Sequence, residues 1–220
     1  MRSRAACLVS VVLAAGLIAA CGGGDDEEPE VELPAGCEQV EEPAPKEVDL
    51  TKPRRLEPPP RGTVAAVGTS CGSFDIALDT AASPKTTASF AYLAEEGVYD
   101  GTAFHRIVPD FVIQGGDPLG DGTGGPGYLI DEPPPDDTDY TRGTVAMAKT
   151  EVEPPGRSGS QFFVVVAAAA GLPADFALLG EVASGRAVTE RIAEVGDPAS
   201  GQGGEPRAPV VIERITLERG

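Results

Sequence analysis

The segment FHRIVPDFVIQGGD, residues 104–117, holds the only histidine of the chain, His105, beside Arg106 and shortly before Gln114. A histidine that acts as a general base needs an orienting carboxylate and a nucleophile, and no triad or nucleophile elbow is recognisable around this one. A lone histidine in an alternating strand is more often a structural hydrogen-bonding residue. We therefore favour a structural role for His105 over a catalytic one.

The glycine-rich stretch GDGTGGPG, residues 120–127, is a second candidate for chemistry. A phosphate-binding loop has a Lys-Ser/Thr pair and leads into a helix, and this stretch has neither feature. It is therefore predicted to be a surface turn. One histidine and no Cys-x-x-Cys pair also exclude a zinc site of the usual kind. The residues thus predict no metal.

The first 20 residues are typical of a secretory signal peptide. Two arginines precede an apolar run, residues 8–20, that is shorter than the ~20 residues of a membrane span. The run ends in LIAAC, which resembles the lipobox of bacterial lipoproteins, where cleavage precedes the cysteine and a diacylglycerol joins its sulfur. We expect lipidation of Cys21 and anchoring at the extracytoplasmic face of the cell membrane. The alternative is an ordinary secretion signal with Cys21 unmodified.

The chain carries a formal net charge of −18, which repels nucleic acid and anionic lipid headgroups. Polynucleotide partners are therefore excluded. Apart from Cys21 and Cys7, which leaves with the signal, two cysteines remain. In an oxidising compartment their pairing is the default, so a Cys37–Cys71 disulfide is predicted. The alternative is two free buried thiols.

Residues 21–60 are rich in Gly, Pro, Asp and Glu, a composition that favours a tether over a packed core. The disulfide would pin the tether near Cys37, and whether the rest orders against the domain is left open. Residues 61–220 are expected to form one domain, and the protein to be a monomer.

Short alternating or β-branched segments predict strands throughout this domain. Ser83 as N-cap and Pro84 at the first helical position predict a helix that ends near Gly97, and a second helix is expected at 185–196. Many short strands with two helices favour a β-barrel over a parallel α/β sheet. The predicted strands are 63–68, 73–79, 103–108, 112–116, 143–149, 161–167, 177–182 and 210–218.

The motifs FHR…F…QGGD, GDGTGG, GTVAMAK, SGSQFFVV and LLGEV occur in one order along the chain. Together they resemble the cyclophilin family of peptidyl-prolyl cis–trans isomerases over about residues 63–219. The resemblance implies a mainly β fold, an eight-stranded antiparallel closed barrel capped by two α-helices. It also implies an open groove for proline-containing polypeptides, with no cofactor or metal.

Isomerisation of an Xaa–Pro bond breaks no covalent bond, but it must cross the ~18–20 kcal/mol barrier of a twisted amide. An apolar pocket for the proline ring and a fixed donor beside the turning amide suffice, and a rigid, permanently charged guanidinium suits that role. By resemblance the catalytic residues are Arg106, Phe111 and Gln114. The substrate-binding residues implied by the resemblance are Val112, Gly122, Ala148, Lys149, Gln161, Phe163, Leu172 and Phe176.

Four positions depart from the family pattern, and one of them is Val112, which replaces a common methionine. Lys149 stands where asparagine is common, and Phe176 where histidine or tyrosine is usual. Gly171 replaces the tryptophan that supports cyclosporin binding in many members. These departures bear on rate and preference more than on reaction type. We therefore expect an isomerase that assists folding of secreted or surface proteins. The alternatives are a proline-motif-binding chaperone module with little turnover and a lipoprotein scaffold with a vestigial groove.

Overall fold

The computed structural model describes residues 31–219, so the predicted signal peptide and the lipidation site Cys21 lie outside the described residues. Of the helices in residues 31–219, none has the length and apolar character needed to cross a membrane. The elements in chain order are β1 (Thr63–Thr69), β2 (Gly72–Leu78), α1 (Pro84–Glu95), β3 (Thr102–Ala103), β4 (Arg106–Val108), β5 (Val112–Gly115), β6 (Ile130–Asp131), β7 (Thr144–Met147), β8 (Arg157–Ser158), β9 (Phe162–Val165), β10 (Leu178–Ser184), α2 (Arg186–Ala193), the 3-10 helix η1 (Pro198–Gly203) and β11 (Val211–Arg219).

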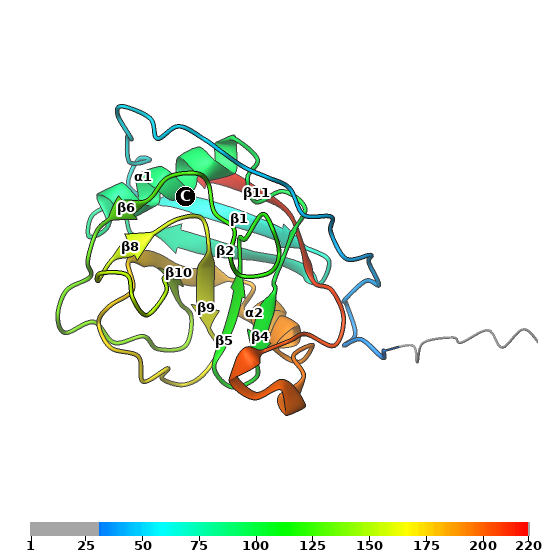
Figure 1. Ribbon diagram of the computed structural model, residues 1–220. Helices are drawn as coiled ribbons and strands as arrows, with labels where there is room; N and C mark the ends of the chain where they lie inside the picture. Colours follow the sequence, from blue (N-terminus) through cyan, green and yellow to red (C-terminus); the bar gives the residue numbers. More distant parts are fainter. Residues whose placement is uncertain (1–30, 220) are drawn as a thin grey trace, which may run out of the picture. The chain divides into compact units, whose positions relative to one another are not determined.

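Within residues 31–219, nine strands form one antiparallel sheet in the order β3-β11-β1-β2-β10-β7-β9-β5-β4, and β6 pairs separately with β8. The sheet curls around a buried core, with α1 against β11 and α2 against β2 and β5 (Figure 1). The prediction of a mainly β, antiparallel fold with two α-helices is confirmed. The main sheet has nine strands with β3 and β4 at its ends, whereas eight strands in a closed ring were predicted.

The extra strand arises where the predicted strand 103–108 changes its partner. The amide of Phe104 donates to the carbonyl oxygen of Val210, next to β11, whereas Arg106 pairs with Gln114 of β5. The chain therefore leaves one strand neighbour and joins another within two residues, which divides the segment into β3 and β4. The short β6, β8 and η1 were not predicted.

The central strands differ in whether one or both of their faces are buried. In β1 every second residue is buried, as alternation predicts for a strand with one solvated face. In β7 and β9 all four residues are buried. One face of these two strands meets the core, and the other meets a second apolar cluster, which is described with the site below.

The N-terminus of α1 is capped by a different residue from the one predicted. Ser83 precedes the helix and Pro84 starts it, but the Ser83 side chain makes no capping hydrogen bond. The carboxylate of Glu132 instead accepts hydrogen bonds from the amides of Lys85 and Thr86, at 3.1 and 2.7 Å. An anion at this end also complements the helix dipole.

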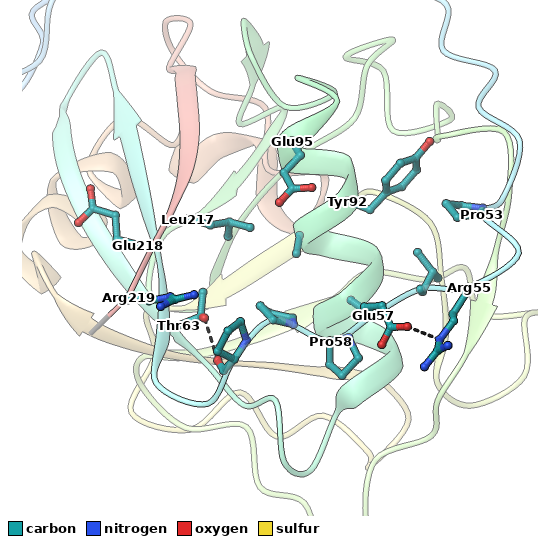
Figure 2. A pocket seen from close by; sticks show the side chains of 15 residues that line it. Pro53, Arg55, Glu57, Pro58, Thr63, Tyr92, Glu95, Leu217, Glu218 and Arg219 are labelled. Carbon is teal, nitrogen blue, oxygen red and sulfur yellow. Dashed lines mark hydrogen bonds and ion pairs between the residues drawn. The ribbon is translucent and has the colours of Figure 1, made fainter.

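Residues 31–60, here called the strap, contain no regular secondary structure but lie along the domain (Figure 1). Four of its apolar side chains pack against the core; they are Val31, Leu33, Val48 and Leu50. Cys37 is bonded to Cys71, which confirms the predicted disulfide. The last part, residues 53–60, crosses α1 beside Tyr92 and leaves a cleft of about 500 Å³ under its prolines (Figure 2).

Candidate active site

A row of side chains crosses the sheet from β4 to β7. Arg106 of β4 pairs with Gln114 of β5, and Gln114 pairs with Phe163 of β9. Phe163 in turn pairs with Ala146 of β7. Directly opposed residues project from the same face of a sheet. These four side chains therefore share the face that points away from the core, while the intervening Ile113, Val145 and Val164 lie inside it.

The apolar part of this face is a compact cluster. Val112 and Phe163 are buried in it, and Phe111, Leu172 and Phe176 pack against it while remaining partly exposed. The rings of Phe163 and Phe176 meet edge to face, with centroids 5.4 Å apart. The structure thus brings together all the apolar residues that were predicted to form the proline pocket.

Phe176 is held in this cluster by a tyrosine that the sequence analysis did not identify. The Tyr140 hydroxyl donates to the Phe176 carbonyl oxygen at 2.7 Å and accepts from the Phe176 amide at 2.9 Å. The two rings also meet edge to face at 6.0 Å. No motif marks Tyr140, because its contacts depend on a residue 36 positions away.

The polar part of the face is a chain of hydrogen bonds that starts at Arg106. Its Nη1 donates to Gln114 Oε1 at 3.3 Å, and Gln114 Nε2 donates to Gln161 Oε1 at 3.1 Å. Gln161 Nε2 then donates to the carbonyl oxygens of Gly122 and Gly124, at 3.0 and 2.9 Å. The predicted polar groove residues are therefore linked directly to Arg106.

The Arg106 guanidinium lies at the edge of the apolar cluster. Its central carbon is 5.7 Å from the centre of the Phe111 ring, and Nε donates to the Gln202 carbonyl oxygen at 3.1 Å. Burial lowers the pKa of Arg106 from its ordinary value. Among residues 31–219 no carboxylate forms an ion pair with it. The guanidinium thus keeps donor capacity for a ligand in the groove.

His105 lies beside these residues in a structural position. Its Nε2 is 3.4 Å from Gln114 Nε2, and its buried Nδ1 has no hydrogen-bond partner among the described residues. Burial is the main cause that lowers the pKa of His105, and the nearby Asp117 partly offsets it. The neutral ring supports Gln114 and has no nucleophile to activate, as the sequence favoured.

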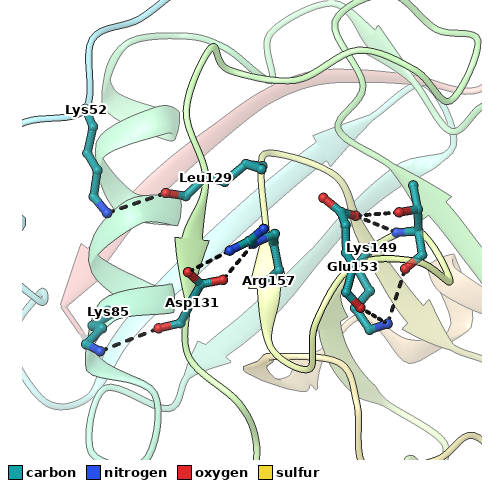
Figure 3. Close-up of polar contacts among 8 residues, drawn as sticks. Lys52, Lys85, Leu129, Asp131, Lys149, Glu153 and Arg157 are labelled. Atoms are coloured by element: carbon teal, nitrogen blue, oxygen red, sulfur yellow. Dashed lines mark hydrogen bonds and ion pairs between the residues drawn. The ribbon is translucent and has the colours of Figure 1, made fainter.

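Lys149 closes one end of the groove, next to Ala148. Its side chain is only 3% exposed, and Nζ lies 2.8 Å from Asp175 Oδ2. The ammonium also donates to the carbonyl oxygens of Thr150 and Glu153 (Figure 3). It sits 5.5 Å from the Phe176 ring centre. The Ala148 amide donates to the Gln161 carbonyl oxygen at 2.8 Å. Lys149 therefore acts on the groove through its neighbours, and its charge does not point into open solvent.

A groove of about 450 Å³ continues from Gln114 and Gln161 along the 122–125 backbone to Ala148 and Lys149. The predicted substrate-binding residues, together with Phe111 and Gln114, lie in the apolar cluster or along this polar wall, and Arg106 contacts both parts. The whole constellation is an apolar cluster flanked by a guanidinium and a polar groove. That arrangement can bind an extended peptide and stabilise a twisted amide without proton transfer.

Comparison with known proteins agrees with this geometry. Residues 64–217 match the family model of cyclophilin type peptidyl-prolyl cis-trans isomerases. The chain belongs to this family. Similar proteins include peptidyl-prolyl cis-trans isomerase B of Streptomyces anulatus, 38% identical over 70% of this chain and 95% of that protein. A probable isomerase B of Mycobacterium leprae is 35% identical over 80% of this chain and 63% of its own, longer chain.

The fold of the cyclophilin family is also present in solved structures. A Cryptosporidium parvum cyclophilin crystallised in the presence of the dipeptide Ala-Pro aligns with a TM-score of 0.64 and 26% identity. The alignment covers 71% of this chain and 99% of that one. The activity expected from the sequence, peptidyl-prolyl cis–trans isomerisation, is therefore the activity of this enzyme, with proline-containing peptides as the substrate class that the family implies.

Proposed function

We propose that Arg106 is the catalytic residue of this isomerase and that its clients are exported proteins. The observation that carries the first part is the place of the guanidinium, at the junction of the apolar cluster and the hydrogen-bond chain. A proline ring in the cluster around Phe163 would bring the Xaa–Pro amide to this edge. There the fixed donor would favour the pyramidal prolyl nitrogen or the turning carbonyl oxygen.

Catalysis in this proposal is preferential binding of the twisted amide. The planar ground state gains little from the guanidinium because its nitrogen lone pair is delocalised into the carbonyl group. Rotation localises that lone pair, and the donor then binds it more strongly. Gln114 holds the guanidinium through Nη1, so the donor is oriented before the amide turns. No residue has to gain or lose a proton.

The proposed client class rests on the leader and on the disulfide. The signal-like residues 1–20 and the LIAAC sequence support export and a lipid anchor on Cys21 at the outer face of the membrane. The Cys37–Cys71 bond supports an oxidising compartment. Polypeptides that emerge into that compartment must isomerise their prolines there, a step that takes tens of seconds or more without a catalyst.

The catalytic assignment is tested with Arg106→Ala, and Arg142→Ala serves as the control because Arg142 lies in an exposed ion pair with Glu190. Isomerisation of an Xaa–Pro peptide is measured with a protease-coupled assay. We expect kcat/KM of Arg106→Ala to fall by ~10²–10³, as for loss of one preorganised donor. The control should keep its rate, and both variants should show unchanged circular dichroism. A folded Arg106→Ala enzyme with full activity would refute the assignment.

The same assay separates the enzyme from the alternative chaperone module. A module would bind a proline peptide at the Phe163 cluster but accelerate isomerisation equally little with or without Arg106.

The lipid anchor is tested by substitution of Cys21. Cys21→Ser should release the protein from the membrane fraction or leave its precursor uncleaved, whereas Cys7→Ser should do neither. Processing and membrane retention of Cys21→Ser would exclude the lipid.

A further inference from the structure

The strap meets the loop that forms the polar wall of the groove. This loop, residues 117–127, is held from within by Asp117, which is buried. One oxygen of its carboxylate accepts from the Leu119 amide at 2.9 Å, and the other accepts from the Gly122 amide at 2.6 Å. The interior of the loop therefore has a fixed shape, and its outer side faces the strap.

The strap holds both ends of this loop from outside. The Lys46 amide donates to the Pro118 carbonyl oxygen at 2.9 Å, and the Leu50 amide donates to the Pro126 carbonyl oxygen at 2.8 Å. The contact is close, because a Cβ added at Gly127 would lie 2.7 Å from Asp49 Oδ1 and 2.9 Å from the Leu50 nitrogen. Five strap residues, 46–50, thus span the loop from Pro118 to Pro126.

Two anchors fix this part of the strap to the rest of the domain. The Lys46 ammonium donates to the carbonyl oxygens of Asp100 and Gly97, at 2.6 and 3.3 Å, in the turn after α1. Nearer the N-terminus, the Cys37–Cys71 disulfide joins the strap to the turn between β1 and β2. The Glu38 amide reinforces that anchor with a hydrogen bond to the Ser70 carbonyl oxygen.

We propose that the strap is a positioning element of the active site, acting through loop 117–127 on Gln161, Gln114 and Arg106. The loop presents the Gly122 and Gly124 carbonyl oxygens to the Gln161 side chain. The side-chain amides of Gln161 and Gln114 are hydrogen-bonded to each other, and Gln114 is hydrogen-bonded to the guanidinium, so the loop position determines where the guanidinium lies. The proposal rests on the proposed catalytic role of Arg106. Lys46 and the disulfide are positioning residues in it, because neither touches the groove.

The expected kinetic signature follows from which half of the site the strap reaches. The apolar cluster around Phe163 is built by other segments, so affinity for the proline ring should persist when the strap is released. The donor should lose its orientation. Misplacement of a catalytic group by 1 Å can cost about 100-fold in rate, and we expect a smaller displacement to lower kcat about tenfold with KM within about twofold.

Gly127→Ala in the full chain is the direct test, because the methyl group would push the strap off the loop. Gly120→Ala is the matched control: Gly120 lies in the same loop with φ +80, close to the +90 of Gly127, but an added Cβ would meet nothing within 4 Å. Both substitutions impose left-handed strain, and only one displaces the strap. Their urea midpoints show whether backbone strain alone separates them.

A second, independent release is Cys37→Ser combined with Lys46→Ala, which removes both anchors and leaves the loop sequence intact. The double variant Cys37→Ser/Lys46→Arg keeps a cationic donor at position 46, and its kcat should exceed that of Cys37→Ser/Lys46→Ala. A general loss of stability would not be relieved in this way. A tenfold fall in kcat in either released variant, with Gly120→Ala unchanged, supports the proposal. Values of kcat within twofold of the control in both released variants overturn it, whatever Arg106→Ala shows, so the strap and the arginine are tested separately.

Discussion

The ion pair between Lys149 and Asp175 joins two segments that wall the groove, and its two ends are buried to different degrees. The lysine side chain is 3% exposed and the aspartate side chain 30%. Removing the carboxylate therefore strands a buried charge, whereas removing the ammonium leaves a carboxylate that water can reach. We predict that Asp175→Asn destabilises the protein more than Lys149→Met does, although Asp175→Asn is the smaller change in shape.

The size of the difference follows from the contacts. Loss of one partner of a buried ion pair costs ~3–5 kcal/mol. In Asp175→Asn the ammonium keeps the carbonyl oxygens of Thr150 and Glu153, at 3.2 and 3.1 Å. We therefore expect the lower figure, about 3 kcal/mol. The Lys149→Met variant keeps the packed aliphatic stem of the side chain. Its free energy of unfolding should fall by about 1 kcal/mol for the lost pair with the solvated carboxylate and by about 0.5 kcal/mol for the lost contact with Phe176.

Equilibrium unfolding in urea measures both variants, with the disulfide intact. The expected gap of about 1.5 kcal/mol corresponds to about tenfold in the folding equilibrium constant. Glu190→Gln is the control, since its pair with Arg142 is 3.4 Å long and lies at the surface, where such pairs contribute little. If Lys149→Met proved as costly as Asp175→Asn, the buried ammonium would not be the dominant charge at this end of the groove.

Two further predictions concern His105 and Gly171. Burial lowers the pKa of His105, so its contribution to stability is complete above the unfolded value of about 6.5 and is lost as the pH falls below that value through the lowered pKa of the folded state. The unfolding free energy of the wild type relative to His105→Gln should therefore drop between pH 7 and 5. We expect kcat/KM to stay flat from pH 6.5 to 8, and a rate that followed this titration would indicate acid–base catalysis by His105. Gly171 is exposed, with nothing within 4 Å of an added Cβ, so cyclosporin should inhibit weakly, and Gly171→Trp should tighten inhibition without raising turnover. Its φ of +64 imposes left-handed strain, which a Gly171→Ala control shares; tight inhibition of the unmodified enzyme would contradict the prediction.

Local patterns were sufficient to predict most of the fold. Every predicted strand is present. The strands could be predicted because alternation and β-branched residues indicate a half-buried strand within a few positions of the chain. The Cys37–Cys71 bond followed from the count of cysteines, and the site residues from motifs that the family shares. These features depend on the residue types themselves, so one sequence carries them.

Features that depend on distant partners could not be predicted. The composition of residues 31–60 indicates a tether, yet a few apolar side chains and backbone amides hold that segment to the domain. Likewise, Glu132 caps α1 from a position 46 or more residues away, and Asp175 neutralises a lysine that stands in place of asparagine. The hydrogen bonds of backbone amides in an irregular segment do not depend on residue type. The position of the strap therefore could not be predicted from sequence patterns.

The apolar run at residues 162–167 is the sequence feature that most directly encodes the function. A strand with one solvated face alternates, but in β9 Phe162 and Val164 enter the core while Phe163 and Val165 join the second cluster. The edge of this second cluster at Phe111 remains partly exposed, and a partly exposed apolar surface of this kind is typical of a ligand-binding site. In the proposed mechanism the proline ring occupies this non-directional surface, and the donor comes from the adjoining row of Gln114 and Arg106. In that mechanism, the register that places Phe163 opposite Gln114 would set where the amide lies relative to the Arg106 donor.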